Sequence, residues 1–156
     1  MLVFHPYVPG YRPVDQQGTW EALGGLWQGA GDKVAHWPCV GPYDYATGLY
    51  AYWDTGAALV IVEHDIVPTA ELADELEECD APFCAVDYVL AGKGRWSSWC
   101  DHAPLGLARV SAECQAWVTA RPAVPRVPWG DLAHELGRRL PAVHVHAGPV
   151  EHSHSQ

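Results

Sequence analysis

The residues that define the fold class most clearly read AALVIVEHD and occupy positions 57–65. The first six, residues 57–62, form a continuous apolar run that ends in residues favouring β-strands. Such a run is typical of a central parallel strand that is covered on both faces. It ends abruptly in Glu63, His64 and Asp65. The sequence therefore predicts a buried strand whose carboxyl end carries three polar side chains.

Apolar runs and helical patterns alternate on both sides of this stretch. Short apolar runs predict further strands at residues 2–4, 33–36, 83–86 and 143–146. Periodic apolar positions predict helices at residues 19–27, 44–53, 69–79 and 129–140, the first three with N-caps at Thr19, Asp44 and Thr69. The alternation of strand and helix through the first 90 residues predicts an α/β layer fold with a mostly parallel sheet.

Three segments carry weaker signals. Residues 105–117 fit a strand or a helix, and the pattern leaves both open. Residues 91–104 are irregular and rich in Gly, Trp and Ser, as expected for a loop near a site. Three prolines make residues 121–128 a loop. Neither an internal repeat nor a domain linker is recognisable, so we expect one domain.

The composition indicates an acidic cytoplasmic protein. The chain has 156 residues, 49% of them hydrophobic, and a formal net charge of −10. This charge argues against nonspecific binding to nucleic acid, which requires clustered Lys and Arg. It favours binding of cations instead. The N-terminus has no basic segment followed by a long apolar stretch, and no apolar run is long enough to span a membrane, so we expect a cytoplasmic location.

The cysteines do not form a recognisable framework. There are five, at positions 39, 79, 84, 100 and 114, and no two are spaced as CxxC. An odd number without such a pair indicates neither a disulfide scaffold nor a zinc ribbon. We expect reduced and mostly buried thiols.

The polar residues after the predicted central strand form a candidate metal site. Ligands of open α/β sheets bind at the carboxyl ends of the strands. In an extended segment, residues i and i+2 point the same way, so Glu63 and Asp65 could direct both carboxylates at one cation. Hard oxygen ligands suit Mg²⁺ or Mn²⁺. A strand end that simply exits into solvent is the alternative explanation.

The string LVIVEHDIVP, residues 59–68, resembles the DxD region of GT-A glycosyltransferases. The resemblance implies a Rossmann-like three-layer sandwich over residues 1–148, followed by a His-rich tail at 149–156. It implies that Mn²⁺ or Mg²⁺ bridges these acidic residues to the diphosphate of a UDP- or GDP-sugar. It also implies that the loop after the first strand, at His5-Pro6-Tyr7, holds the nucleotide base. The sugar acceptor, whether glycan, protein or small molecule, is not indicated.

Four histidines lie close together near the C-terminus. His144 and His146 alternate on the predicted last strand, and His152 and His154 follow in the tail. Such density of imidazoles is common in metal-binding segments. The resemblance to GT-A enzymes assigns a late histidine to the metal, first His152 and then His154. A solvated tail without a function is the alternative.

Several residues are candidates for catalysis. The resemblance implies a carboxylate base at the start of a late helix, and Asp131 occupies such a place. Its position also fits simple helix capping. Asp87, after the strand predicted at 83–86, is a second candidate, and Arg109 could contact phosphate. Asp101 and His102 are a third possibility.

Two other classes of function remain open at this point. The chain could be a non-catalytic carbohydrate- or metal-binding protein with a transferase-like sheet, for which the eight tryptophans are an argument. It could also be a metal-dependent hydrolase, in which Glu63, Asp65 and the late histidines hold Zn²⁺.

Overall fold

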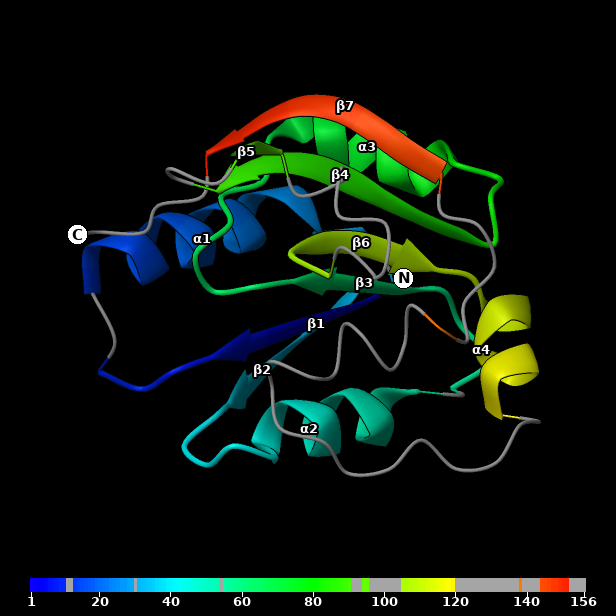
Figure 1. Cartoon of the computed structure of the whole chain (residues 1–156), viewed down its shortest axis with the longest axis horizontal. Helices are drawn as coiled ribbons and strands as arrows, with labels where there is room; N and C mark the ends of the chain where they lie inside the picture. The colour runs from blue at the N-terminus through cyan, green and yellow to red at the C-terminus, as the bar shows by residue number, and fades with distance from the viewer. Residues whose placement is uncertain are drawn as a thin grey trace.

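The chain folds into a seven-stranded sheet with helices on both faces (Figure 1). The structure, a computed structural model, describes residues 1–10, 13–29, 31–53, 55–90, 94–95, 105–119, 138 and 144–151. The elements follow in the order β1 (Leu2–Tyr7), α1 (Pro13–Leu26), β2 (Lys33–Pro38), α2 (Asp44–Tyr52), β3 (Leu59–Val62), α3 (Ala70–Glu78), β4 (Phe83–Leu90), β5 (Gly94–Arg95), β6 (Leu107–Val110), α4 (Ala112–Thr119) and β7 (His144–Glu151).

The sheet is mixed rather than mostly parallel in its pairings. Its order is β2-β1-β3-β6-β4-β5, and β7 pairs with β4. Three pairings are parallel, those of β1 with β2, β1 with β3, and β4 with β7. Strand β6 runs antiparallel to both β3 and β4, and β5 runs antiparallel to β4. The predicted α/β class is confirmed, whereas the expected parallel arrangement holds only for part of the sheet.

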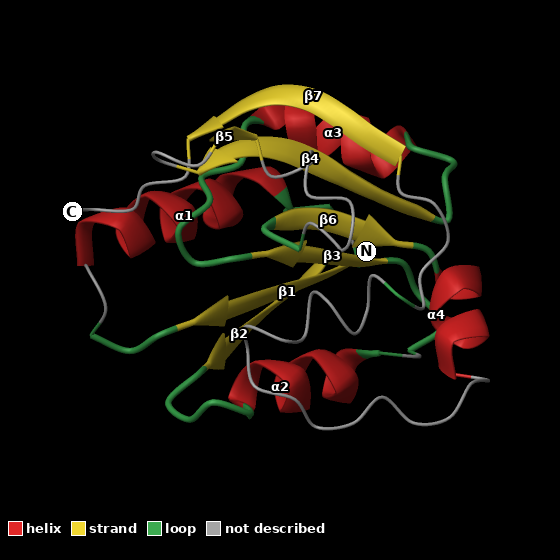
Figure 2. Ribbon diagram, viewed as in Figure 1, coloured by secondary structure: helices red, strands yellow, loops and turns green. Residues whose placement is uncertain are grey.

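The fold has three layers, because the buried strands send alternate side chains to opposite faces (Figure 2). In β3, Leu59 and Ile61 join a cluster that includes Leu49 of α2. Val60 and Val62 join a second cluster, which includes apolar side chains of α1 and α3. All four residues of β3 have zero exposure, so the predicted coverage of this strand on both faces is confirmed. Its neighbour β6 runs antiparallel to it.

Two helices begin at other residues than the capping pattern suggests. Helix α1 begins at Pro13, a residue whose fixed φ suits the first helical turn, so Thr19 lies inside the helix instead of capping it. Asp44 is the first residue of α2, and its carboxylate accepts hydrogen bonds from the backbone N–H groups of Val40 and Gly41. The N-cap predicted at Thr69 is confirmed, since its hydroxyl accepts a hydrogen bond from the backbone N–H of Leu72 in the first turn of α3.

The ambiguous segment 105–117 contains both of the structures that its pattern allowed. Residues 107–110 form β6, and α4 begins two residues later. The last strand, predicted at 143–146, continues to Glu151 and so extends past the predicted domain boundary at residue 148. The helix predicted at 129–140 and the loop predicted at 121–128 lie outside the described residues, apart from Arg138.

Gly48 in α2 is expected to resist substitution by alanine. A Cβ atom at this position would lie 2.5 Å from Cδ1 and 2.6 Å from Nε1 of Trp37, whose indole donates a hydrogen bond to the backbone oxygen of Asp44. The indole must therefore move, and we expect Gly48→Ala to destabilise the protein by about 1–3 kcal/mol despite the better helix propensity of alanine. Urea unfolding measures the change.

Gly24→Ala in α1 is the matched control for this prediction. A Cβ atom at Gly24 would meet nothing within 4 Å. This variant is expected to be neutral or stabilised by up to about 1 kcal/mol. Equal free energies of unfolding for Gly48→Ala and the wild type would contradict the close approach of Trp37.

Candidate functional site at the carboxyl edge of β1–β3

The strands β1 and β3 separate at their carboxyl ends. Their ladder ends at the pair of Phe4 and Ile61, whereas β1 remains paired with β2 as far as Tyr7 and Pro38. Figure 1 shows the two strands diverging beyond this point. Strand β1 also lies between β2 and β3, so the strand order reverses there. Open α/β sheets bind ligands outside the carboxyl ends of their strands, where the strand order reverses.

Residues 63–66, which we call the acidic turn, follow β3 at this edge. The backbone N–H of Ile66 donates to the oxygen of Glu63 over 3.1 Å, and that of Glu63 donates to the oxygen of Gly106 over 2.8 Å. His64 and Asp65 occupy the centre of the turn, with 7% and 5% exposure. The expectation that residues 63 and 65 alternate as in an extended strand is therefore wrong, because the chain turns directly after Val62.

Side chains from both helical layers hold the acidic turn. The hydroxyl of Thr19, on α1, lies 2.9 Å from the backbone oxygen of His64 and 3.0 Å from that of Ile66. The phenol of Tyr45, on α2, donates to Oε1 of Glu63 over 3.0 Å. Because these partners come from opposite faces of the sheet, the turn has a fixed position at its edge. The contribution of Thr19 and Tyr45 was not predicted from the sequence.

A pair of histidines lies beside the acidic turn. His5 of β1 and His36 of β2 are direct partners in the parallel ladder, and their Nδ1 atoms are 2.9 Å apart. In this hydrogen bond, one of the two nitrogens carries a proton and acts as the donor, and the other has no proton and acts as the acceptor. At least one of the two rings is therefore uncharged. Burial, with repulsion from protonated His36 and His64, lowers the pKa of His5 to about 3. His5 is therefore neutral at physiological pH.

Aromatic rings surround this histidine pair on the side of α1. Trp20 stacks on His36 with ring centroids 3.7 Å apart, and its ring edge contacts His5 and Tyr7 at 5.3 and 5.4 Å. Trp20 is 37% exposed, whereas Leu23 and Trp27, which follow it at helical spacing, are buried. Neither Trp20 nor His36 was predicted as part of a site. Their proximity depends on the register of β1 and β2, which the sequence does not show.

The structure brings some of the predicted residues together and places others elsewhere. His5, Pro6 and Tyr7 are the last residues of β1, where this strand still pairs with β2 but no longer with β3. Arg109 lies on β6, and its guanidinium donates to the backbone oxygens of Cys79 and Ala81 rather than reaching the carboxyl edge.

The proposed acids and late histidines are mostly outside the described part of the chain. Asp87 lies within β4, next to a register shift in the pairing with β7, and its side chain is not described. Asp131, His152 and His154 lie outside the described residues, as do Asp101 and His102.

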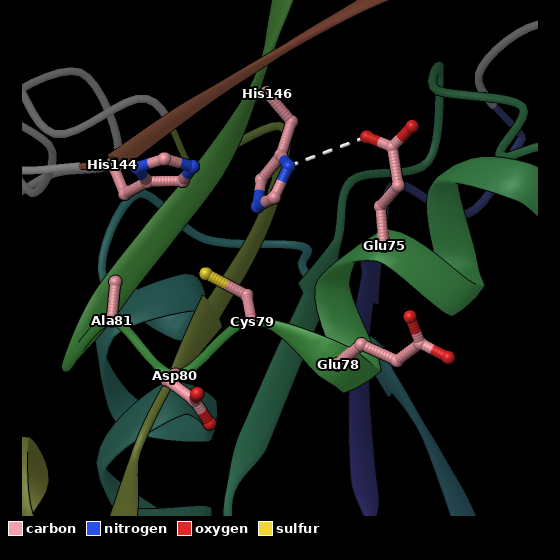
Figure 3. A pocket seen from close by; sticks show the side chains of 7 residues that line it. All are labelled: Glu75, Glu78, Cys79, Asp80, Ala81, His144 and His146. Atoms are coloured by element: carbon pink, nitrogen blue, oxygen red, sulfur yellow. Dashed lines mark ion pairs between the residues drawn. The ribbon is translucent and has the colours of Figure 1, made fainter.

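The two late histidines that are described lie away from the acidic turn. His144 and His146 lie at the beginning of β7, paired with the beginning of β4, and their rings are 4.7 Å apart. Both line a pocket with Glu75 and Cys79, which Figure 3 shows. Strand β7 is separated from β3 by β4 and β6, so these imidazoles lie three strands away from the acidic turn.

Comparisons with known proteins leave the site to be interpreted from its geometry. No protein-family model matches the sequence, and a search of curated proteins finds no significant match. Among the described residues, no helix has the length and apolar character needed to cross a membrane.

Acidification is expected to destabilise the fold through His5. The unfolded chain binds a proton at this residue below pH about 6.5, whereas the folded chain binds it only near pH 3. The folded state thus binds fewer protons between these values, and the free energy of unfolding falls as the pH falls, by up to about 1.4 kcal/mol per pH unit. Urea unfolding at several pH values measures this slope.

His5→Gln provides the control, because glutamine does not titrate. Its free energy of unfolding should depend less on pH than that of the wild type in the range between pH 3 and 6.5. Identical pH profiles for the two proteins would show that His5 does not exclude a proton in the folded state.

Proposed function

We propose that the carboxyl edge of β1–β3 binds a divalent cation and a nucleotide sugar, and that the chain is a GT-A-like glycosyltransferase. The observation that carries this proposal is the position of the acidic turn. It follows a completely buried strand, β3, at the point where β3 diverges from β1 and the strand order reverses. A carboxylate-bearing turn at this place fits the general location of ligands in open α/β sheets.

The acidic turn offers the chemistry that Mn²⁺ or Mg²⁺ requires. Such ions are commonly bound through one or two carboxylates, with water and substrate phosphate completing the shell. Glu63 and Asp65 are the carboxylates of this turn, and the hydrogen bond from Tyr45 holds one oxygen of Glu63 in position. The chain has a net charge of −10, so a cation would also offset the repulsion of an anionic diphosphate.

The neighbouring aromatic group suits the base or sugar of the donor. Trp20 is partly exposed and stacked on His36, close to Tyr7 at the end of β1. Planar aromatic side chains bind flat ligands by stacking. His5, which is uncharged, adds no positive charge to this environment. A uridine or guanosine could therefore lie against this end of β1 while its diphosphate reaches the acidic turn.

The chemistry of sugar transfer assigns distinct roles to these groups. A divalent cation would stabilise the negative charge that develops on the departing nucleotide diphosphate. The carboxylates hold that cation, and the buried turn keeps them in place. An inverting reaction also needs a base that takes the proton of the acceptor hydroxyl. Asp131 and Asp87 remain the candidates for this base, and the acceptor is not identified.

A thermal-shift titration tests the proposal. UDP and GDP are added to the full-length protein with and without Mn²⁺. Binding to the folded state is expected to raise the melting temperature only when nucleotide and cation are both present, with about 2.7 kcal/mol of stabilisation at a hundred times the Kd. No shift with either nucleotide in the presence of Mn²⁺ would reject the proposal.

A non-catalytic carbohydrate-binding protein is the second candidate, and one observation favours it. Trp20 is partly exposed and lies on a rigid stack, as expected for a sugar-binding platform. For this function, soluble glycans would raise the melting temperature without nucleotide or cation. The hydrolase alternative loses two of its four late histidines, because His144 and His146 lie on β7, three strands away from β3 and its acidic turn.

A further inference from the structure

A second group of metal-binding side chains lies around the first residues of β4. Cys79 follows α3, Cys84 is the second residue of β4, and His146 lies on β7. The two sulfur atoms and one imidazole nitrogen all lie within 4.8 Å of one another. We propose that Cys79, Cys84 and His146 bind a structural Zn²⁺ ion that joins α3 and β4 to the C-terminal strand β7.

The spacing of the ligand atoms fits zinc after small side-chain movements. With Zn–S bonds of about 2.3 Å and Zn–N bonds of about 2.0–2.1 Å, the ligand atoms of a tetrahedral site lie roughly 3.5–3.8 Å apart. The ligand atoms of the three residues lie up to 4.8 Å apart, about 1 Å more than in such a tetrahedral site. Rotation of the side chains closes such a difference, so the backbone can stay as it is.

The hydrogen bonding of His146 leaves one nitrogen for a metal. Its Nδ1 atom lies 3.3 Å from Oε2 of Glu75, on α3. Its Nε2 atom is buried and has no hydrogen-bond partner among the described residues. A carboxylate that holds one imidazole nitrogen while the other binds the ion is the usual arrangement around zinc ligands. Figure 3 shows the second nitrogen of His146 turned toward the sulfur of Cys79.

The surroundings position the two cysteines. Arg109 donates from its guanidinium to the backbone oxygens of Cys79 and Ala81, at 2.7 and 3.4 Å, and so holds the loop between α3 and β4.

The ligand set selects the metal. Two thiolates and an imidazole suit Zn²⁺, whereas Mn²⁺ and Mg²⁺ prefer oxygen ligands. Cys79 and His146 line the pocket that Figure 3 shows, which has a volume of ≈ 450 Å³, so a fourth ligand could reach the ion from this pocket. His144 lies on the wall of this pocket, 4.7 Å from His146 between ring centroids, and can complete the shell, as can a water molecule.

The metal content of the full-length, untagged protein tests this proposal. Protein purified with Zn²⁺ and then dialysed is expected to retain about one zinc ion per chain, and a strong chelator should lower its melting temperature. Cobalt in place of zinc should give the visible absorption of tetrahedral thiolate coordination. Protein that retains no zinc, or that shows a Cys79–Cys84 disulfide by the loss of two hydrogens, would overturn the proposal.

Variants separate this site from other cysteines and histidines. Cys79→Ser and His146→Ala should weaken zinc binding more than about 100-fold, and Glu75→Gln should weaken it by about 10–100-fold. The matched controls Cys39→Ser and Cys114→Ser, which replace buried thiols outside the cluster, should keep full affinity. Zinc binding that survives Cys79→Ser in a folded protein, or that disappears with His152→Ala and His154→Ala alone, would contradict the assignment.

The zinc site and the proposed nucleotide site can fail separately. The acidic turn follows β3, whereas the cysteine and histidine cluster lies at the end of α3 and on β4 and β7, so the two sites share no residue. His146→Ala should therefore lose zinc while keeping any Mn²⁺-dependent response to nucleotide. Loss of both responses in a folded His146→Ala variant would indicate that the two regions are not independent and would contradict a purely structural role.

Discussion

Asp65→Asn is expected to abolish the Mn²⁺-dependent stabilisation by UDP or GDP. Asparagine keeps the size of the side chain, so the turn between Glu63 and Ile66 should form as before. It removes the negative charge that a divalent cation requires, and oxygen ligands of Mn²⁺ and Mg²⁺ are most often carboxylates. The stabilisation of the folded state by the bound ligand, about 2.7 kcal/mol at a hundred times the wild-type Kd, should disappear entirely. Thermal unfolding with and without Mn²⁺ measures this.

Two further variants make the result specific. Glu77→Gln, an exposed position on α3, removes the same charge from the chain and should leave the response unchanged. Tyr45→Phe should reduce the response without abolishing it, because it removes the hydrogen bond from Tyr45 to Glu63 but keeps both carboxylates of the turn. An undiminished response in Asp65→Asn would contradict the assignment of the acidic turn to the metal.

Phe4→Ala is expected to destabilise the protein by about 3–5 kcal/mol. Phe4 has zero exposure and packs between the ring of Tyr45, at 5.9 Å, and that of Tyr52, at 5.8 Å. It also occupies the last pair of the β1–β3 ladder, directly before the strands diverge. Removing the ring leaves a cavity in the layer between the sheet and α2. Because total stabilities are about 5–15 kcal/mol, much of the protein could unfold at moderate temperature.

Urea unfolding measures this loss against a surface control. Val40→Ala, at a position that is 84% exposed, should change the free energy of unfolding by no more than about 0.5 kcal/mol. A loss below about 1 kcal/mol for Phe4→Ala would show that the residue is not packed as described.

Local patterns predicted much of the fold. The apolar run before Glu63 predicted the buried strand β3, because four consecutive apolar residues at a strand position require cover on both faces. Thr69 predicted the start of α3, because its hydroxyl satisfies a free backbone N–H group. Both signals lie within a few residues of the structure that they specify.

The features that were not predicted depend on contacts distant in sequence. Strand β6 lies between β3 and β4 and runs antiparallel to both. The apolar patterns of β3 and β4 do not indicate this neighbour, so it could not be predicted from them. The pair of His5 and His36 exists because β1 and β2 are aligned in one particular register. Short-range reasoning also misjudged residues 63–66, since an extended strand and a turn can follow the same apolar run.

The cysteine and histidine cluster was missed for a similar reason. Cys79 and Cys84 are separated by four residues rather than two, so the usual motif spacing did not reveal them. Their proximity to His146 arises from the parallel pairing of β4 with β7. The alternation of His144 and His146 was noticed, and the two rings do lie together, but beside thiols and not beside the acidic turn.

Anomalous diffraction from a crystal that contains Mn²⁺ and UDP or GDP tests the central claim most directly. The account predicts a manganese peak within coordination distance of carboxylate oxygens of Asp65 or Glu63, with the nucleotide diphosphate on its other side. A manganese peak at the cysteine cluster alone, or a nucleotide bound without metal away from residues 63–66, would contradict it.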